Sequence, residues 1–185
     1  YLFQKLIRTG FNTNNVDHCT RLCHASSVVA LLEMIGSGAV SNQVADVTEA
    51  EVIIIIGSNP TVNHPVAATF MKNAAKEGKK LIVMDPKQVE IARHATHFLQ
   101  FKPDTDVALL NAIMKSIIDQ DLVDSDFIKN RTKDFENLKN HLKDYTPEKM
   151  SKICGISVRK INEIAKIYAT SPASIIFWGM GISQH

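Results

Sequence analysis

The chain has 185 residues, a formal net charge of +2, 45% hydrophobic residues and 22% charged residues. This length suits one domain with a sizeable core, in the composition range of ordinary globular proteins. The small net charge, one Trp, three Tyr and no basic cluster longer than Lys79-Lys80 argue against a nucleic-acid partner. The longest apolar run, 52–56, is too short to cross a bilayer, so we expect no membrane span in this segment.

The cysteine count and the two ends of the sequence also carry information. Three cysteines are too few for a disulfide scaffold, and an odd number leaves one thiol free, which favours a reducing, cytoplasmic compartment. The sequence starts without Met inside a helical pattern and stops after an apolar strand pattern. We therefore expect a segment of a longer protein.

Two helices and a reactive loop are predicted in the first fifty residues. Apolar residues at helical spacing predict a helix over 1–8, ended by Gly10, and an Asn-rich loop follows. Ser26 or Ser27 can cap a second helix over 28–35, which is ended by the motif Gly36-Ser37-Gly38. This motif lacks a third glycine and follows no strand, so it is not a dinucleotide fingerprint.

The segment 17–24 joins two thiols, two imidazoles, an acid and a guanidinium. A neighbouring cation or a helix start lowers the pKa of a thiol, and a thiolate can act as a nucleophile, a redox group or a soft metal ligand. Cys19 and Cys23 are one helical turn apart, but the spacing matches no common zinc site, even with His18, His24, His64 or Cys154 added. Inert buried cysteines and a hydrogen-bonded His24 remain the structural alternative.

The middle of the chain alternates strand and helix patterns. A β-branched run over 51–57 predicts a central parallel strand that is covered on both faces. Further strands are expected over 79–84, 96–102 and 174–179, helices over 65–76 and 107–118, and a helical stretch near 125–170. This order predicts an α/β fold with a doubly wound, mostly parallel sheet in a Rossmann-like three-layer arrangement.

Polar residues follow each predicted strand, where ligands bind in open α/β sheets. Gly57 allows close backbone approach, Asn59 offers a donor and an acceptor, and Asp85 is placed to accept from ribose hydroxyls. Asp106 can accept from the N–H edge of a guanine. Any one of these residues taken alone is better explained as a turn or helix-cap residue, but together at the strand ends they favour a ligand that carries a nucleotide.

The motifs resemble, in order along nearly the whole chain, those of formate dehydrogenase catalytic (alpha) subunits in the molybdopterin oxidoreductase (dimethyl sulfoxide reductase) family. The matching segments are Asn14-Asn15-Val16-Asp17-x-Cys19-x-Arg21-x-Cys23-His24, Gly57-Ser58-Asn59-Pro60, Asn63-His64-Pro65, Asp85-Pro86-Lys87, Lys102-Pro103-x-Thr105-Asp106-Val107-Ala108-Leu109 and Trp178-Gly179-Met180-Gly181-x-x-Gln184. The pair Cys23-His24 favours formate over nitrate, because many nitrate reductases of this family have Met after the metal-ligating Cys.

The resemblance implies a molybdenum or tungsten centre with two molybdopterin guanine dinucleotides. Cys23 matches the metal ligand, and His24 matches the neighbouring histidine that assists transfer of the formate proton. The residues that resemble those holding the cofactor are Gly57, Asn59, His64, Asp85, Thr105, Asp106, Met180 and Gln184. Cys19 then becomes a packing residue. A 4Fe-4S cluster and its electron-transfer subunits are expected outside this segment.

Two departures fall in the cofactor segments. The family commonly has Arg where this chain has Lys87, and Gly where it has Asp104. Lys keeps the charge but loses the fork of Arg, and Asp104 adds a negative charge near expected phosphates.

The sequence thus predicts part of a formate dehydrogenase that is inactive by itself. We divide it into a metal-ligand loop with helices (1–50), a nucleotide-binding α/β part (51–124) and a helical insertion with a returning strand (125–185). The alternatives are another oxidoreductase of the family, such as a nitrate reductase, a nucleotide-binding module without a redox role, and a structural zinc protein.

Overall fold

The computed structural model describes residues 1–40 and 42–184, apart from the side chains of Thr20 and Arg21. These residues form two compact units, 1–40 with Gln184, and 42–183, and each unit is described by itself. Among the described residues, no helix combines the length and the apolar composition needed to cross a membrane.

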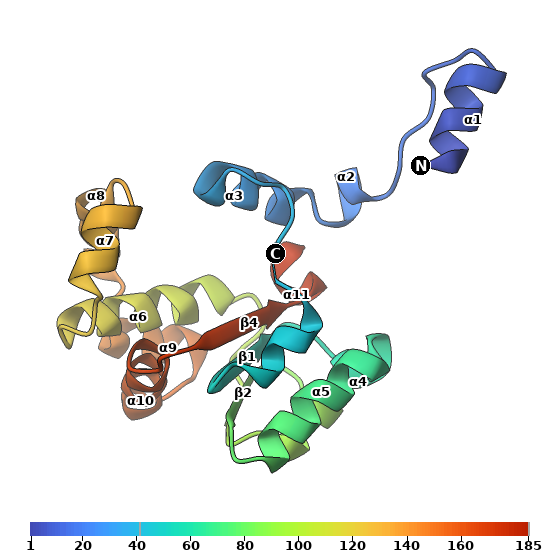
Figure 1. Ribbon diagram of the computed structural model, residues 1–185. Helices are drawn as coiled ribbons and strands as arrows, with labels where there is room; N and C mark the ends of the chain where they lie inside the picture. The colour runs from blue at the N-terminus through green and yellow to red at the C-terminus, as the bar shows by residue number, and fades with distance from the viewer. Residues whose placement is uncertain (41, 185) are drawn as a thin grey trace. The chain divides into compact units, whose positions relative to one another are not determined.

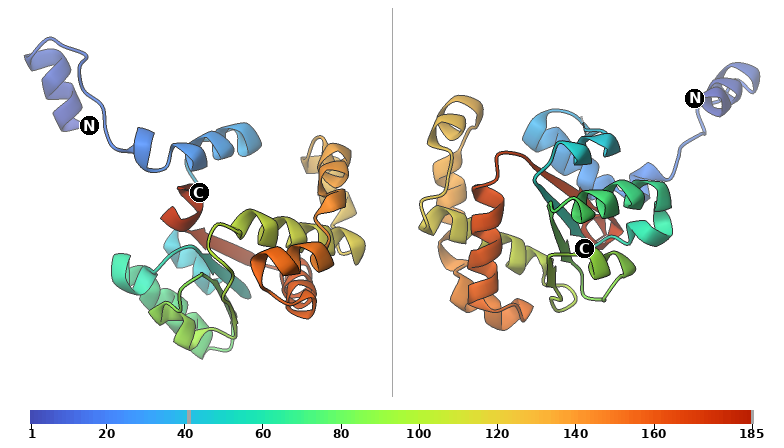
Figure 2. Two further views of the ribbon diagram at one scale, coloured as in Figure 1. Left: turned by 180° about the vertical axis from the view of Figure 1, so that it is seen from behind. Right: turned by 60° about the horizontal axis from the view of Figure 1, so that its bottom comes forward.

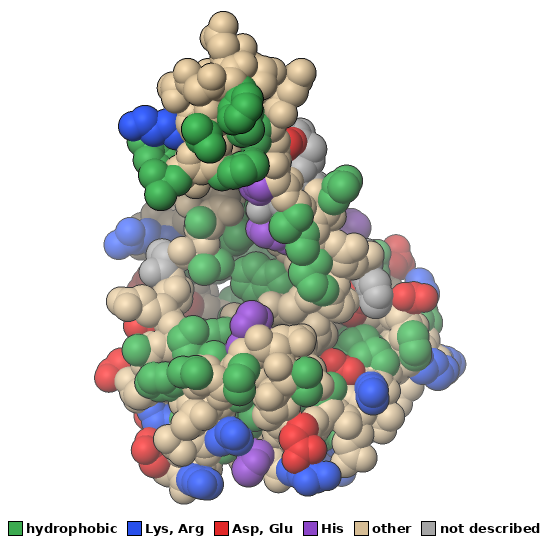
Figure 3. Space-filling view, turned by 90° about the vertical axis from the view of Figure 1, so that its right-hand side faces the viewer, with side chains coloured by type: hydrophobic (Ala, Val, Ile, Leu, Met, Phe, Trp, Pro, Cys, Tyr) green, Lys and Arg blue, Asp and Glu red, His purple; other side chains and the backbone are tan. Residues whose placement is uncertain are grey.

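The first unit contains three helices: α1 (Leu2–Gly10), α2 (Thr20–Cys23) and α3 (Ala25–Ile35) (Figure 1). Neither α1 nor α3 has a buried residue. The apolar side chains of α1 are largely exposed. Figure 3 shows one face of the molecule, with hydrophobic side chains at its surface in green. Helix α3 starts three residues before the predicted position, with His24 as its N-cap in place of a serine. Gly36 ends α3 at φ +75°, as predicted.

The second unit carries the remaining elements. The strands are β1 (Val52–Ile56), β2 (Lys80–Met84), β3 (His97–Leu99) and β4 (Ser174–Trp178). The α-helices are α4 (Pro60–Asn63), α5 (Pro65–Lys76), α6 (Asp106–Asp119), α7 (Ser125–Arg131), α8 (Phe135–His141), α9 (Pro147–Cys154), α10 (Val158–Ala169) and α11 (Met180–Ser183). Short 3-10 helices are η1 (Val44–Thr48), η2 (Glu90–His94) and η3 (Leu142–Asp144).

The four strands form one parallel sheet in the order β3-β2-β1-β4. The prediction of a doubly wound, mostly parallel sheet is confirmed, and so is the helical stretch near 125–170, which contains α7 to α10 (Figure 2). The prediction for the third strand was too long, since only His97–Leu99 pair with β2.

Helices cover both faces of the sheet. Alternate residues of β1 point to opposite sides: Ile53 and Ile55 pack in the cluster that includes α5, while Ile54 and Ile56 pack in the cluster that includes α6, α9 and α10. All five β1 side chains are buried, as expected for a β-branched strand at the centre of a parallel sheet. The result is a three-layer arrangement in which the segments that follow the strands line the carboxyl edge of the sheet.

Candidate functional site

The carboxyl ends of three strands lie in one row. Parallel register pairs Ile56 of β1 with Met84 of β2 and with Trp178 of β4, so Gly57, Asp85 and Gly179 follow along the same edge. The chain runs from β1 to β2 and β3 on one side, whereas β4 lies on the other side of β1. This reversal is a topological switch point, where open α/β sheets form their ligand crevice.

Gly57 stands at this switch point in a conformation that favours glycine. Its φ is +56°, and a Cβ built there would lie 2.9 Å from the carbonyl carbon of Gly181. The Gly181 N–H donates to the Gly57 carbonyl over 3.0 Å, which draws α11 against the end of β1. The close approach seen at Gly57 is therefore between the end of β1 and the backbone of α11. Met180, which opens α11, is 42% exposed.

Asn59 and His64 flank the short helix α4, which was not predicted. Asn59 is its N-cap residue, and its side-chain oxygen accepts from the Thr61 hydroxyl over 2.7 Å. His64 ends α4 and precedes α5, and its side chain is exposed. The amide of Asn59 is thus oriented by Thr61 of α4, whereas His64 is placed between the two helices with an exposed side chain.

Asp85 is the half-buried carboxylate of the row. Its Oδ1 accepts from the backbone N–H of Lys87 over 2.8 Å. Burial raises the pKa of Asp85 above its ordinary value, against the opposing effects of this hydrogen bond and of the Lys87 charge. A partly desolvated carboxylate at a strand end is suited to accept hydrogen bonds from ligand hydroxyls.

Thr105 and Asp106 form the start of α6. The Thr105 hydroxyl donates to the Lys102 carbonyl over 2.6 Å, and Asp106 is only 5% exposed. Burial of the Asp106 side chain limits its reach toward a ligand in the present arrangement. Asp104, just before them, has φ +60°, in the region where glycine is favoured. Glycine would adopt this backbone conformation with less strain than Asp does.

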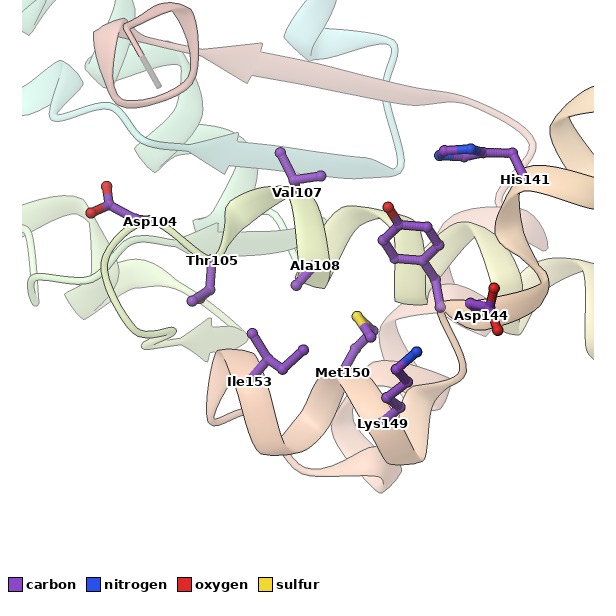
Figure 4. Close-up of a pocket in the computed structure, with 10 residues that line it drawn as sticks. Asp104, Thr105, Val107, Ala108, His141, Asp144, Lys149, Met150 and Ile153 are labelled. Atoms are coloured by element: carbon purple, nitrogen blue, oxygen red, sulfur yellow. The ribbon is translucent and has the colours of Figure 1, made fainter.

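A pocket of about 580 Å³ opens beside this helix start (Figure 4). Asp104 and Thr105 line it together with residues from η3, α9 and the segment between them: Asp144, Tyr145, Lys149, Met150 and Ile153. The rings of Tyr145 and His141, another lining residue, have centroids 5.3 Å apart. The sequence prediction missed this helical side of the pocket, because its residues follow no strand and form no motif.

Cys23 and His24 lie in the first unit, at the break between two helices. Cys23 ends α2, is half-exposed, and donates its backbone N–H to the Cys19 carbonyl over 2.7 Å. His24 is half-exposed, and its carbonyl accepts from Val28 in the first turn of α3. The Gln184 side-chain amide donates to the Leu22 carbonyl over 3.3 Å and also to the Cys23 carbonyl. This backbone contact ties Gln184 to the segment that carries the thiol.

The other two cysteines differ in burial. Cys19 is exposed, so the prediction that it is a packing residue is wrong for this chain. Cys154 is fully buried within the core beside α6 and α10, the inert environment considered for a structural cysteine. In the part of the chain that the structure describes, no group of three or more His, Cys, Asp or Glu residues is arranged to hold a metal ion.

Comparison with known proteins supplies the family. The chain is 47% identical over 184 residues to the F420-dependent formate dehydrogenase 1 subunit alpha of Methanococcus maripaludis, and 38% identical to formate dehydrogenase H of Escherichia coli. Each match covers 100% of this chain, but only 27% and 26% of the relative, so the chain spans about a quarter of their length.

A solved structure agrees. Acetylene hydratase from Pelobacter acetylenicus matches with a TM-score of 0.77 and 27% identity, over 89% of this chain and 22% of that one. The sequence model described as molybdopterin oxidoreductase matches residues 1–185. The chain therefore belongs to the molybdopterin oxidoreductase family, whose members carry a molybdenum or tungsten pterin cofactor.

Proposed function

We propose that this chain is part of a formate dehydrogenase catalytic subunit that oxidises formate to carbon dioxide at a molybdenum or tungsten centre with two pterin guanine dinucleotides. The observation that carries the proposal is 38–47% identity, over the full length of the chain, to proteins named as formate dehydrogenases. The structural neighbour is named as a hydratase, so the fold alone does not select the reaction. The 185 residues alone are proposed to be inactive.

The residues present fit such a cofactor by their chemistry. Cys23 offers a half-exposed thiol, the soft ligand that binds molybdenum or tungsten. The strand-end row offers the amide of Asn59 and the half-buried carboxylate of Asp85, which suit the hydroxyls and base edge of a nucleotide. We keep His64, Thr105, Asp106, Met180, Gly57 and Gln184 as proposed cofactor-binding positions.

His24 has the role of proton acceptor in this proposal. Oxidation of formate breaks its C–H bond and yields carbon dioxide, one proton and two electrons. The metal-pterin group, held through Cys23 and the strand-end residues, would supply the acceptor for the two electrons. A 4Fe-4S cluster outside this chain is proposed as the next acceptor. The imidazole of His24, adjacent to Cys23, takes the proton and releases it to solvent, because a ring nitrogen of a neutral imidazole can accept a proton.

The wider context belongs to the same proposal. Residues 1–50 carry the metal ligand, 51–124 the nucleotide-binding part, and 125–185 a helical insertion with the returning strand β4. We propose a cytoplasmic enzyme whose partners are iron–sulfur or other electron-transfer subunits.

The test uses the longer protein and three variants: Cys23→Ala, His24→Ala and, as a matched control, Cys19→Ala. Cys23→Ala is expected to lose formate oxidation and bound metal, whereas His24→Ala loses activity but retains metal. Cys19→Ala removes an exposed thiol one turn away and should keep both. Formate oxidation at the wild-type rate in Cys23→Ala contradicts the metal-ligand role.

Two measurements separate the alternatives. Reduction of nitrate without oxidation of formate indicates a different oxidoreductase of the family. A longer protein that contains neither molybdenum nor tungsten favours a nucleotide-binding module, and one equivalent of zinc favours a structural zinc protein.

A further inference from the structure

Cys19 is a thiol that the proposed function leaves without a role. It is exposed, and Cys23, four residues later, is half-exposed. The Cys23 N–H donates to the Cys19 carbonyl over 2.7 Å, so one turn of α-helix separates the two residues. Residues four apart on a helix lie on the same face. The two thiols therefore lie on one side of α2, within reach of a common ligand.

The turn that carries both thiols is stabilised at its carboxyl end. Helix α2 has only four residues, and Figure 1 shows it as a single turn between α1 and α3. The carbonyls of a last helical turn have no partner within the helix. The Gln184 side-chain amide donates to the carbonyls of Leu22 and Cys23, and so supplies partners for two of them. The spacing of the thiols is thereby stabilised in the absence of any ligand.

This spacing fits a bridging cation better than a disulfide. The Cβ atoms of residues four apart on a helix lie about 5–6 Å from each other, whereas a disulfide needs about 3.5–4.5 Å. A direct S–S bond would therefore require the turn of α2 to open. A cation between the two sulfur atoms lengthens the bridge and leaves the turn intact.

The donor set selects the kind of cation. Thiolate sulfur is a soft donor that favours Cu(I) and zinc among the common metal ions. Structural zinc sites take four ligands, but among the residues that the structure describes, no third His, Cys, Asp or Glu completes a metal site with this pair. Two thiolates are enough for Cu(I). We propose that Cys19 and Cys23 form a two-thiolate site for Cu(I) when the chain is without its cofactor.

The binding step releases two protons and transfers no electron. Each thiol loses its proton, and the two thiolates coordinate one Cu⁺, so that the site carries a net charge of −1. Because Cys23 is also the proposed ligand of molybdenum or tungsten, copper and the cofactor compete for the same sulfur. This competition rests on the proposed function, whereas the copper site itself does not.

Competition with the Cu(I) chelator bathocuproine disulfonate tests the site on the longer protein, prepared anaerobically without molybdenum or tungsten. The parent is expected to hold one more equivalent of Cu(I) than Cys19→Ser, which changes an exposed side chain. In the variant, the affinity for this equivalent is expected to fall by about 10²–10⁴-fold, because the gain from a second linked donor is lost. Other cysteines of the longer protein are the same in both samples and cancel in the difference.

The double variant Cys19→Ser/Leu22→Cys is the matched control. It keeps the number of thiols but places two of them at adjacent positions, which do not face each other on a helix. Leu22 is 87% exposed, so its replacement removes no core packing. Retention of the extra equivalent of Cu(I) by either variant overturns the proposal, and so does its absence from the parent.

Loading the cofactor separates this inference from the proposed function. With molybdenum or tungsten bound, the extra equivalent of Cu(I) is expected to be lost, because Cys23 is occupied. If the loaded parent binds it as tightly as the unloaded parent, the copper site stands and the role of Cys23 as cofactor ligand fails. Copper content, rather than formate oxidation, is the readout in each case.

Discussion

Replacing Gly57 with alanine tests the backbone contact at the switch point of the sheet. The φ of +56° puts alanine in the left-handed region, which costs about 1–2 kcal/mol for a residue with a side chain. The new Cβ would also lie 2.9 Å from the Gly181 carbonyl carbon, and backbone must shift to admit it. Overpacking of this kind costs about 1–3 kcal/mol, so Gly57→Ala should lower the free energy of unfolding by about 2–5 kcal/mol.

Gly78→Ala is the matched control for this variant. Gly78 has φ +92°, but a Cβ there would meet no atom within 4 Å, so only the cost of the conformation, about 1–2 kcal/mol, applies. Urea denaturation of the two variants and the parent chain, followed by circular dichroism, gives the free energies. Equal losses in Gly57→Ala and Gly78→Ala would refute the close contact between β1 and α11. A loss at Gly57 that exceeds the loss at Gly78 by about 1–3 kcal/mol supports it.

Four other substitutions test the packing of the core, a helix cap, a strained backbone position and a half-buried carboxylate. Ile55 is fully buried in β1, so Ile55→Ala should lower the free energy of unfolding by about 2–5 kcal/mol, whereas Ile55→Val should lower it by only about 0.5–1.5 kcal/mol. Urea denaturation measures both values, and similar losses in the two variants would contradict tight packing at Ile55. Asp124→Ala removes the side chain that caps α7 by accepting from the Phe127 backbone N–H. It should lower the free energy of unfolding by about 0.5–2 kcal/mol in urea denaturation, and an unchanged free energy would contradict the capping role. Asp104→Gly relieves the φ of +60° and should raise the free energy of unfolding by about 0.5–1 kcal/mol; a decrease would show that its side-chain interactions outweigh the strain. Burial raises the pKa of Asp85 above 3.8, so the folded state holds its proton more tightly than the unfolded state, and stability is lost as pH rises through the folded pKa. Asp85→Asn should therefore stabilise the chain at pH 7 and have no such effect below about pH 3.8, as measured by thermal unfolding at both pH values; destabilisation at pH 7 would contradict this reasoning.

Local chemistry was enough to predict most of the elements of the second unit. The run of isoleucines in β1 has to be covered on both faces, and α5 occupies the predicted range Pro65–Lys76 between a proline and a glycine. The start of α3 was predicted too late, because a serine cap was assumed where His24 takes that position. Short elements such as α4 and η1 were missed, since a single turn carries no periodic pattern.

The sequence by itself determined the family and the residue types at the strand ends, because motif order and the polarity of loops are local properties. The tertiary structure decided which of these loops share an edge. Placement of β4 beside β1 brings Gly179 into line with Gly57 and Asp85, although more than a hundred residues separate the two strands. It also decided that Asp106 is buried, that Cys19 is exposed and that Tyr145 joins Asp104 at one pocket. These outcomes depend on packing between distant segments, and no pattern within one segment can encode them.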